Sequence, residues 1–196
     1  MKVELEKSHA LAVPADIAWR VLQNIESVAS CMPGAAITER VDDANYKGTV
    51  TVRVGPATVS FKGDIEVKDI DANKRELRLV GKGSDTSGQS GASMDLLAWI
   101  QEGDAAHCQL VGRSEVTVTG KVASFGGRMM GTVSDQILKQ FFDNFSSLVA
   151  ASAAQQGGVA ATEAGARPAR ELNALSLFWA IVKDFFRNLF SHKKTG

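Results

Sequence analysis

Hydrophobic and polar side chains alternate along much of residues 1–120, which is the pattern of strands that bury one face. Residues 1–12 are predicted to form the first strand, with Val3, Leu5 and Leu11 on one face. Further alternating runs lie at about 46–54, 59–68, 77–79, 92–101 and 107–120. Because the connections are short, these strands are predicted to pair as an antiparallel meander. Residues 81–91, rich in Gly and Ser, are predicted to be a loose loop or an irregular edge.

Three helices are predicted beside the strands. Pro14 opens a first short helix, where its missing N–H is harmless, and a second covers about Ile25 to Ser30. A long helix is predicted from about Ser124 to Ala154. Its large apolar residues recur at every fourth position, at Phe125, Met129, Val133, Ile137, Phe141 and Phe145, and the stripe is widened by Met130, Leu138, Phe142 and Val149.

So wide a stripe needs apolar partners on more than one side. The elements together predict an α+β helix-grip fold. In it, a curved antiparallel sheet of about six to seven strands surrounds the long C-terminal helix, and two short helices follow the first strand. A cavity can lie between the sheet and the long helix.

The C-terminal region is predicted to be separate from this domain of residues 1–154. Residues 155–171 are rich in Gly, Ala and Gln and are predicted to be a flexible linker. Residues 172–196 are predicted to form an amphipathic helix with a basic end. Its predicted membrane-binding residues are Leu175, Phe178, Trp179, Val182, Phe185, Phe186, Leu189, Phe190, Lys193 and Lys194.

This tail is too short and too charged to predict a membrane span, and its pattern favours binding at a membrane surface. Docking in the groove of a partner protein, or on the parent domain, stays open as an alternative. The charges follow the same division of the chain. The whole chain has 22 basic and 22 acidic residues, so no net field attracts nucleic acid, whereas residues 155–196 carry six basic and three acidic residues.

Candidate catalytic and metal-ligating residues are sparse. Cys31 and Cys108 have no metal or redox spacing, and they indicate a reducing compartment. His9, His107 and His192 lie far apart, and no serine has a nucleophile-elbow context. We therefore expect neither an enzyme nor a metal site. The N-terminus lacks the apolar run of a secretory signal.

Several positions leave two interpretations open. His9, on the apolar face of the first strand, is either a satisfied core residue or a hydrogen-bonding partner for a ligand carbonyl. The same two interpretations apply to Lys7 and Arg113. The Phe and Met side chains of the long helix either belong to the core or line a cavity. Gly126-Gly127 is predicted to let strand and helix pack closely rather than to bind phosphate.

Four local patterns occur in a fixed order along the chain. They are Cys31-Met32-Pro33-Gly34, Val54-Gly55-Pro56, Phe61-Lys62-Gly63 and Val118-Thr119-Gly120-Lys121-Val122-Ala123-Ser124-Phe125-Gly126-Gly127-Arg128. So ordered, they resemble the G-subunit family of carbon monoxide dehydrogenase, a branch of the START-like helix-grip superfamily. The resemblance covers about residues 1–150. The first pattern is also predicted, from its residues, to be a turn that ends a helix and starts a strand.

The resemblance implies a non-catalytic accessory protein of a molybdenum-containing carbon monoxide dehydrogenase or a related hydroxylase. The implied roles are to recruit that enzyme to the cytoplasmic face of the cell membrane and to bind a quinone, such as menaquinone, as its electron acceptor. No other cofactor is expected. The expected ligand cavity is lined by Phe61, Trp99, Phe125, Met129, Val133, Ile137, Phe141 and His9.

Two other functions remain open. The chain could be a purely structural adaptor that tethers an enzyme complex to the membrane without binding a ligand. It could also be an enzyme, such as a cyclase or hydrolase, built in the same cavity.

Overall fold

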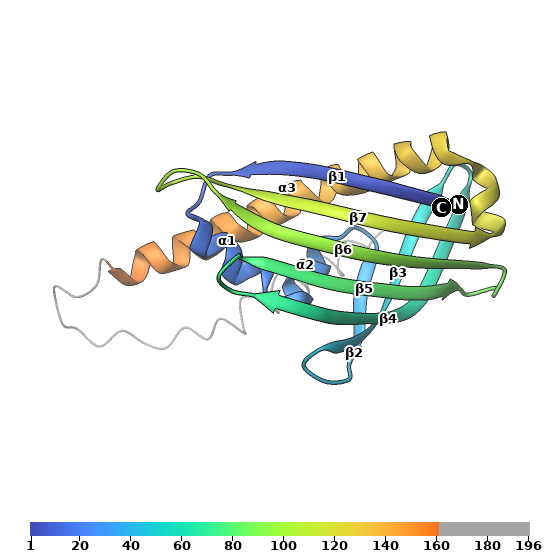
Figure 1. Ribbon diagram of the computed structural model, residues 1–196, viewed down its shortest axis with the longest axis horizontal. Coiled ribbons are helices and arrows are strands. Elements are labelled where there is room, and N and C mark those ends of the chain that lie inside the picture. Colours follow the sequence, from blue (N-terminus) through green and yellow to red (C-terminus); the bar gives the residue numbers. More distant parts are fainter. Residues whose placement is uncertain (161–196) are drawn as a thin grey trace, which may run out of the picture. The chain divides into compact units, whose positions relative to one another are not determined.

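Seven strands form one antiparallel sheet in this protein. The computed structural model describes residues 1–160, and Figure 1 shows the sheet with its strands in the order β1-β7-β6-β5-β4-β3-β2. The strands are β1 (Lys2–Leu11), β2 (Ala35–Arg40), β3 (Asn45–Val54), β4 (Ala57–Asp71), β5 (Glu76–Asp85), β6 (Ser90–Glu102) and β7 (Cys108–Gly120). Every neighbouring pair is antiparallel, and β1 closes one edge by pairing with β7.

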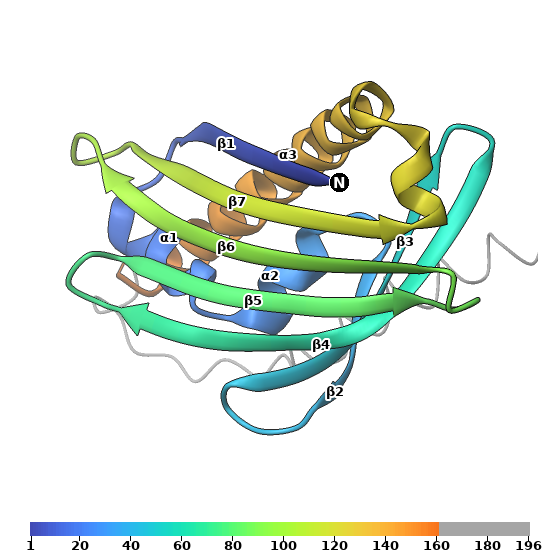
Figure 2. The ribbon, with the colours of Figure 1, turned by 45° about the vertical axis from the view of Figure 1, so that its right-hand side comes forward.

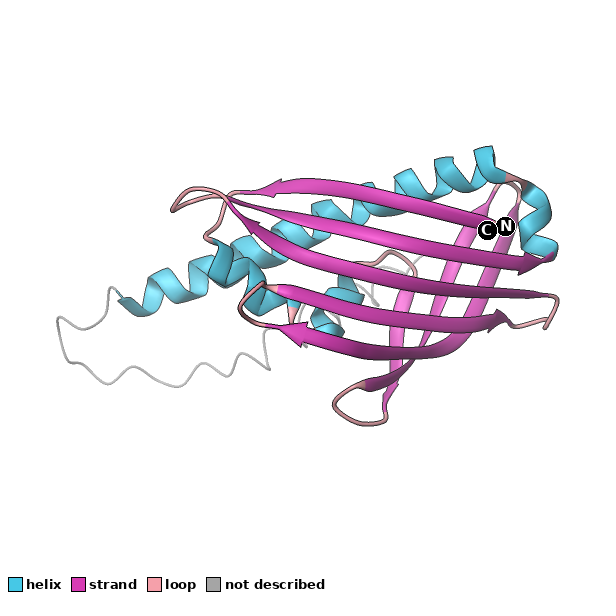
Figure 3. Cartoon of the chain, viewed as in Figure 1, coloured by secondary structure: helices cyan, strands magenta, loops and turns pink. Residues whose placement is uncertain are grey.

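The helices lie on one side of this sheet, as Figure 3 shows by colour. They are α1 (Ala15–Leu22), α2 (Ile25–Cys31), the short 3-10 helix η1 (Lys121–Phe125) and the long helix α3 (Gly127–Ala160). In Figure 2 the sheet bends around α3. The start of α2 is fixed by Asn24, whose side-chain oxygen accepts a hydrogen bond from the Ser27 N–H at 3.0 Å.

This architecture confirms the predicted helix-grip class, with the two short helices after the first strand and a long C-terminal helix. The strand at residues 35–40 also follows the Met32-Pro33-Gly34 turn, where Gly34 has a φ of 76°. A side chain at Gly34 would collide with the Thr51 carbonyl, so this turn needs glycine.

The prediction of a loose loop at residues 81–91 is wrong. β5 runs on to Asp85 and β6 begins at Ser90, so most of this segment forms a hairpin. Gly83 serves close packing between strands, because a Cβ there would lie 2.7 Å from the Lys62 carbonyl oxygen of β4. Glycine weakens an isolated strand, but here it lets neighbouring backbones approach where the sheet bends.

The boundaries of α3 also differ from the prediction. The segment before it, Lys121–Phe125, is a 3-10 helix, and α3 ends at Ala160, six residues beyond the expected Ala154. Gln155 and Gln156 are good helix formers, which explains the first part of the extension. The rest of the predicted linker and the predicted tail helix, residues 161–196, lie outside the described residues. Within residues 1–160, no helix is both long and apolar enough to cross a bilayer.

The buried residues form two separate clusters. The larger, the α1 core, joins α1, α2 and the C-terminal half of α3 to the sheet. Its most buried large side chains include Leu11, Leu22, Leu77, Phe145 and Val149. The smaller, the η1 core, consists of Phe61, Val118 and Val122 at the other end of the sheet. α3 is therefore anchored most firmly at its C-terminal half.

Replacing Phe145 by alanine tests this anchor. The side chain is fully buried (0% exposed), so Phe145→Ala should lower the free energy of unfolding by about 3–5 kcal/mol in urea titrations. Gln140→Ala, at an exposed position of the same helix, is the control and should change it by less than about 0.5 kcal/mol. A loss below about 1 kcal/mol at Phe145 would contradict the proposed anchoring.

Candidate ligand-binding site

One side of α3 faces the sheet, and its side chains change in size along the helix. Phe145 and Val149, 0% and 1% exposed, mark the facing side. At 3.6 residues per turn, the same side passes through Leu138, Ser134 and Gly131 toward the N-terminus of the helix. The helix therefore presents large side chains to the sheet at its C-terminal half and small ones at its N-terminal half.

The sheet is also lined by small residues opposite the N-terminal half of α3. Gly112 pairs with Lys7, whose ammonium contacts Asp135 of α3, so this part of the sheet lies beneath that part of the helix. A Cβ placed on Gly112 or Gly81 would meet only sheet atoms within 4 Å, and one placed on Gly131 would meet nothing. Small residues here therefore do not serve close packing between α3 and the sheet, because no atom of α3 lies within 4 Å of a Cβ placed on Gly81 or Gly112.

We call this region the α3–sheet space. Apolar side chains surround it from both surfaces, and each is only partly buried. The sheet contributes Val50, Ile65, Met94, Leu96 and Val116, and the helix contributes Met130, Leu138 and Phe141. Apolar groups that face one another without full burial provide a surface for an apolar ligand.

The predicted cavity residues on α3 do not share one environment. Residues four apart advance about 40° around a helix, so their row turns away from the sheet along its length. Met129 is 37% exposed near the Gly55 turn, Val133 and Ile137 are half-buried, and Phe141 is half-buried with its ring 5.8 Å from that of Phe145. Phe141 therefore lies nearest to the side that carries Phe145, whereas Ile137, Val133 and Met129 lie progressively further around the helix, and their role as cavity residues stays a prediction.

Two other predicted residues lie at the η1 end of the sheet. Phe61 is 8% exposed and belongs to the η1 core, and the half-buried Phe125 packs against that core. They close the end of the α3–sheet space rather than line its middle. Gly126 has a φ of 79°, and a Cβ on Gly126 or Gly127 would meet nothing within 4 Å. The expected close packing at this glycine pair is therefore wrong, and Gly126 serves the backbone turn.

Trp99 is a correction to the sequence analysis. Side chains alternate between the two faces of a strand, and its neighbours Ala98 and Ile100 are buried in the α1 core. Trp99 therefore points to the opposite face, where it pairs with Val111 of β7, and it does not line the α3–sheet space. The run Leu96 to Ile100 is apolar at every position, so alternation in the sequence could not assign the face.

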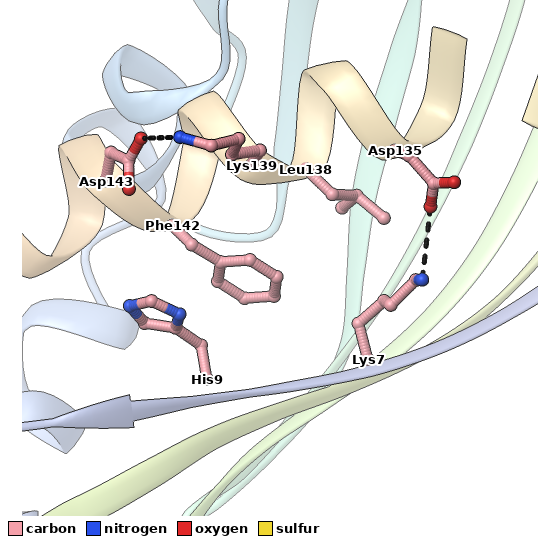
Figure 4. Close-up of a pocket in the computed structure, with 7 residues that line it drawn as sticks. All are labelled: Lys7, His9, Asp135, Leu138, Lys139, Phe142 and Asp143. Carbon is pink, nitrogen blue, oxygen red and sulfur yellow. Dashed lines mark hydrogen bonds and ion pairs between the residues drawn. The ribbon is translucent and has the colours of Figure 1, made fainter. Parts of the chain in front are cut away.

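His9 is a satisfied residue at the edge of the site. Its Nε2 lies 2.9 Å from the Ser146 hydroxyl, and its ring stacks on Phe142 with centroids 4.8 Å apart and planes 9° apart. Figure 4 shows these rings beside a groove between β1 and α3, which has a volume of about 240 Å³. Lys7 also faces this groove, whereas Arg113 points to the other face and pairs with Glu6 at 3.0 Å.

A larger hollow, of about 470 Å³, follows the free edge of β2 beside α2. Its lining includes Glu26 and Ser30 of α2 and every residue of β2. None of the residues predicted for the ligand cavity lines it, and most of the β2 side chains are exposed. It is therefore not part of the candidate site.

The described residues contain little that suggests catalysis. Burial raises the pKa of the Cys31 and Cys108 thiols, which disfavours the reactive thiolate. Residues 1–160 hold no group of three His, Cys, Asp or Glu placed to bind a metal ion. Ser146 is hydrogen-bonded to His9 at the edge of the site, whereas Ser114 and Ser134 on the facing surfaces have no His, Asp or Glu partner in this part of the chain.

The small residues on the facing surfaces of α3 and the sheet were not predicted from the sequence to be part of the site. Gly131 and Ser134 of α3, with Gly81 and Gly112 of the sheet, matter because of what they lack. A signal was present, since Gly127, Gly131 and Ser134 share the side of the helix that carries Leu138 and Phe145 further along. Small residues inside a wide apolar stripe indicate either close packing or a void, and only the structure distinguishes the two.

Solved structures share this fold at low sequence identity. A conserved protein from Geobacillus kaustophilus is 22% identical with a TM-score of 0.69, and the match covers 76% of this chain and 97% of that one. An aromatase/cyclase from a Streptomyces species is 16% identical with a TM-score of 0.57, over 76% and 94% of the two chains. A START superfamily protein from Mycobacterium smegmatis is 14% identical with a TM-score of 0.53, over 74% and 96%.

These likenesses establish the START-like fold. No curated protein matches the chain. A family model does match, and it describes the G subunit of carbon monoxide dehydrogenase (CoxG). The match runs over residues 8–150, which include the last four residues of β1, the rest of the sheet and most of α3. The chain therefore belongs to the CoxG family, whose members are accessory subunits associated with carbon monoxide dehydrogenase.

Proposed function

We propose that this protein binds a quinone or a similar apolar molecule in the α3–sheet space and links a molybdenum-containing carbon monoxide dehydrogenase-type enzyme to the cytoplasmic membrane. The observation that carries the ligand half is at Gly131. This residue faces the sheet, yet a Cβ there would meet nothing within 4 Å. The protein interior is normally close-packed, so a space bordered by apolar groups in this position has room for a ligand.

The chemistry of the walls supports an apolar ligand of this kind. The bordering side chains are aliphatic, with Met94 and Met130 as adaptable thioethers and Phe141 as an aromatic ring. Such a lining suits a chain of hydrocarbon, and an aromatic ring can stack on a planar head group. Membership of the CoxG family supports a carbon monoxide dehydrogenase-type enzyme as the partner, because the matching family model describes a component of carbon monoxide dehydrogenase.

A catalytic role has less support. The aromatase/cyclase from Streptomyces shares the fold, but at 16% identity the likeness concerns the fold alone. Acid–base chemistry would need paired titratable groups inside the space, whereas the Lys7–Asp135 and Lys139–Asp143 pairs are exposed ion pairs at the neighbouring groove. An accessory function that carries a ligand without transforming it therefore fits the site best.

The membrane half of the proposal rests on the tail sequence. Residues 172–190 place Phe178, Phe185 and Phe186 on the apolar side of a helical wheel, and Lys193 and Lys194 follow. An amphipathic helix with a basic end binds an anionic surface through apolar burial and charge attraction. Peripheral binding at the cytoplasmic face would bring the α3–sheet space close to membrane quinones.

Filling the space should abolish ligand binding. We expect Gly131→Leu to weaken binding of a decyl-substituted benzoquinone by about tenfold or more, because the new side chain occupies the ligand volume. Isothermal titration of the full chain measures this. The fold should be retained, because leucine has a higher helix propensity than glycine by about 0.5–1 kcal/mol.

The matched control is Gln136→Leu, which introduces the same side chain on the solvent-facing side of α3. It should leave the affinity within about twofold of that of the parent chain. Equal binding by the two variants would contradict the proposed site. Absence of binding in the parent chain would favour an adaptor that tethers the enzyme without a ligand.

Apolar residues of the tail should control membrane binding. We expect the double substitution Phe178→Glu and Phe186→Glu to lower the partition of the full chain onto vesicles containing anionic lipid by about tenfold or more, because two buried rings are replaced by charges. The control is Asn173→Glu and Asn188→Glu, which adds the same charge to the polar side. Co-sedimentation in which both double variants lose binding equally would contradict insertion through this apolar side.

A further inference from the structure

The groove between β1 and α3 is bordered by two ion pairs. Lys7 of β1 lies 3.1 Å from Asp135 of α3, and Lys139 lies 3.1 Å from Asp143 one helical turn away. All four side chains line the groove, as Figure 4 shows. They contribute two positive and two negative charges, so the rim of the groove has no net charge.

The floor of the groove is formed by rings and an aliphatic side chain. His9 and Phe142 stack in parallel, and the His9–Ser146 hydrogen bond fixes the imidazole. Leu138 also lines the groove. On the helix, Leu138 is one turn from Ser134 on the side that faces the sheet, so it borders both the groove and the α3–sheet space.

We propose that this groove receives the polar end of the ligand and selects a neutral, hydrogen-bond-accepting head group over an anionic one. The proposal rests on the proposed function, since it assumes that the apolar part lies in the α3–sheet space. The shared chemistry is a carbonyl oxygen, which both quinones and lipid esters carry. The Lys7 ammonium has three N–H groups, so it can donate to a carbonyl while it remains paired with Asp135.

Selection follows from charge balance. A neutral carbonyl loses little hydration on entering a partly covered groove, and one N–H donor replaces what it loses. An anionic head group loses far more, and its attraction to Lys7 and Lys139 is offset by repulsion from Asp135 and Asp143. A groove built to hold a carboxylate or phosphate would carry unpaired cations instead.

The test compares two probes of equal chain length on the full chain. Methyl dodecanoate carries a neutral ester, and dodecanoate carries a carboxylate that is ionised at about pH 8. Each displaces a bound decyl-substituted benzoquinone in competition titrations at low salt, where electrostatic differences are least screened. We expect the ester to compete at least about tenfold better than the carboxylate.

Variants with one charge removed then test whether the groove residues cause the preference for the neutral probe. Asp135→Asn and Asp143→Asn each give the groove one net positive charge. Each should lower the ratio of ester affinity to carboxylate affinity by about threefold to tenfold. Both aspartates are exposed on the helix surface, 63% and 60%, so the fold should be retained. Asp95→Asn is the control, because it makes the same change in net charge at the Arg78 ion pair on the opposite face of the sheet.

The outcomes separate this inference from the proposed function. Equal competition by the two probes in the parent chain would overturn neutral selection while leaving an apolar site in place. An unchanged preference in both groove variants, or the same change in Asp95→Asn, would overturn the assignment to this groove. Binding of neither probe nor the quinone would overturn the proposed function itself. Comparison of the quinone with the ester also shows which neutral head group is preferred.

Discussion

A straight α-helix cannot keep one row of side chains against a curved sheet for all the 34 residues of α3. Residues spaced by four advance about 40° at each step, so the row that is buried at Phe145 has turned outward by Met129. The side that does face the sheet near the N-terminus carries Gly131 and Ser134. α3 is consequently buried against the sheet around Phe145 and Val149 and carries small residues on its facing side around Gly131, and the proposed site depends on this difference.

The two buried clusters explain how the protein tolerates the separation. The α1 core holds the C-terminal half of α3 through fully buried side chains, and the η1 core supports the start of the helix through Phe125 and Met130. Between them the helix is tied to β1 by the exposed Lys7–Asp135 pair, which contributes little stability. A buried cluster therefore supports α3 on each side of the proposed site.

Much of the fold could be predicted because its signals are periodic. Alternation identified the strands, and the change to a helical period at Phe125 identified α3. Two features could not be predicted from the sequence because they depend on residues that are remote in the chain. The glycines of β5 looked like a loop until their contact with β4 was known, and the face of Trp99 could not be assigned in a strand that is apolar on both faces. The space beside Gly131 could not be predicted, because small residues inside an apolar stripe are compatible with close packing as well as with a void.

Diffraction from crystals pressurised with xenon would test the central claim most directly, because xenon occupies apolar voids without a head group or a specific contact. The account predicts a xenon peak between Gly131 and the sheet near Gly112, with Leu138 and Leu96 among its neighbours. The absence of xenon there, with side chains closing α3 onto the sheet along its whole length, would contradict a ligand site in this protein.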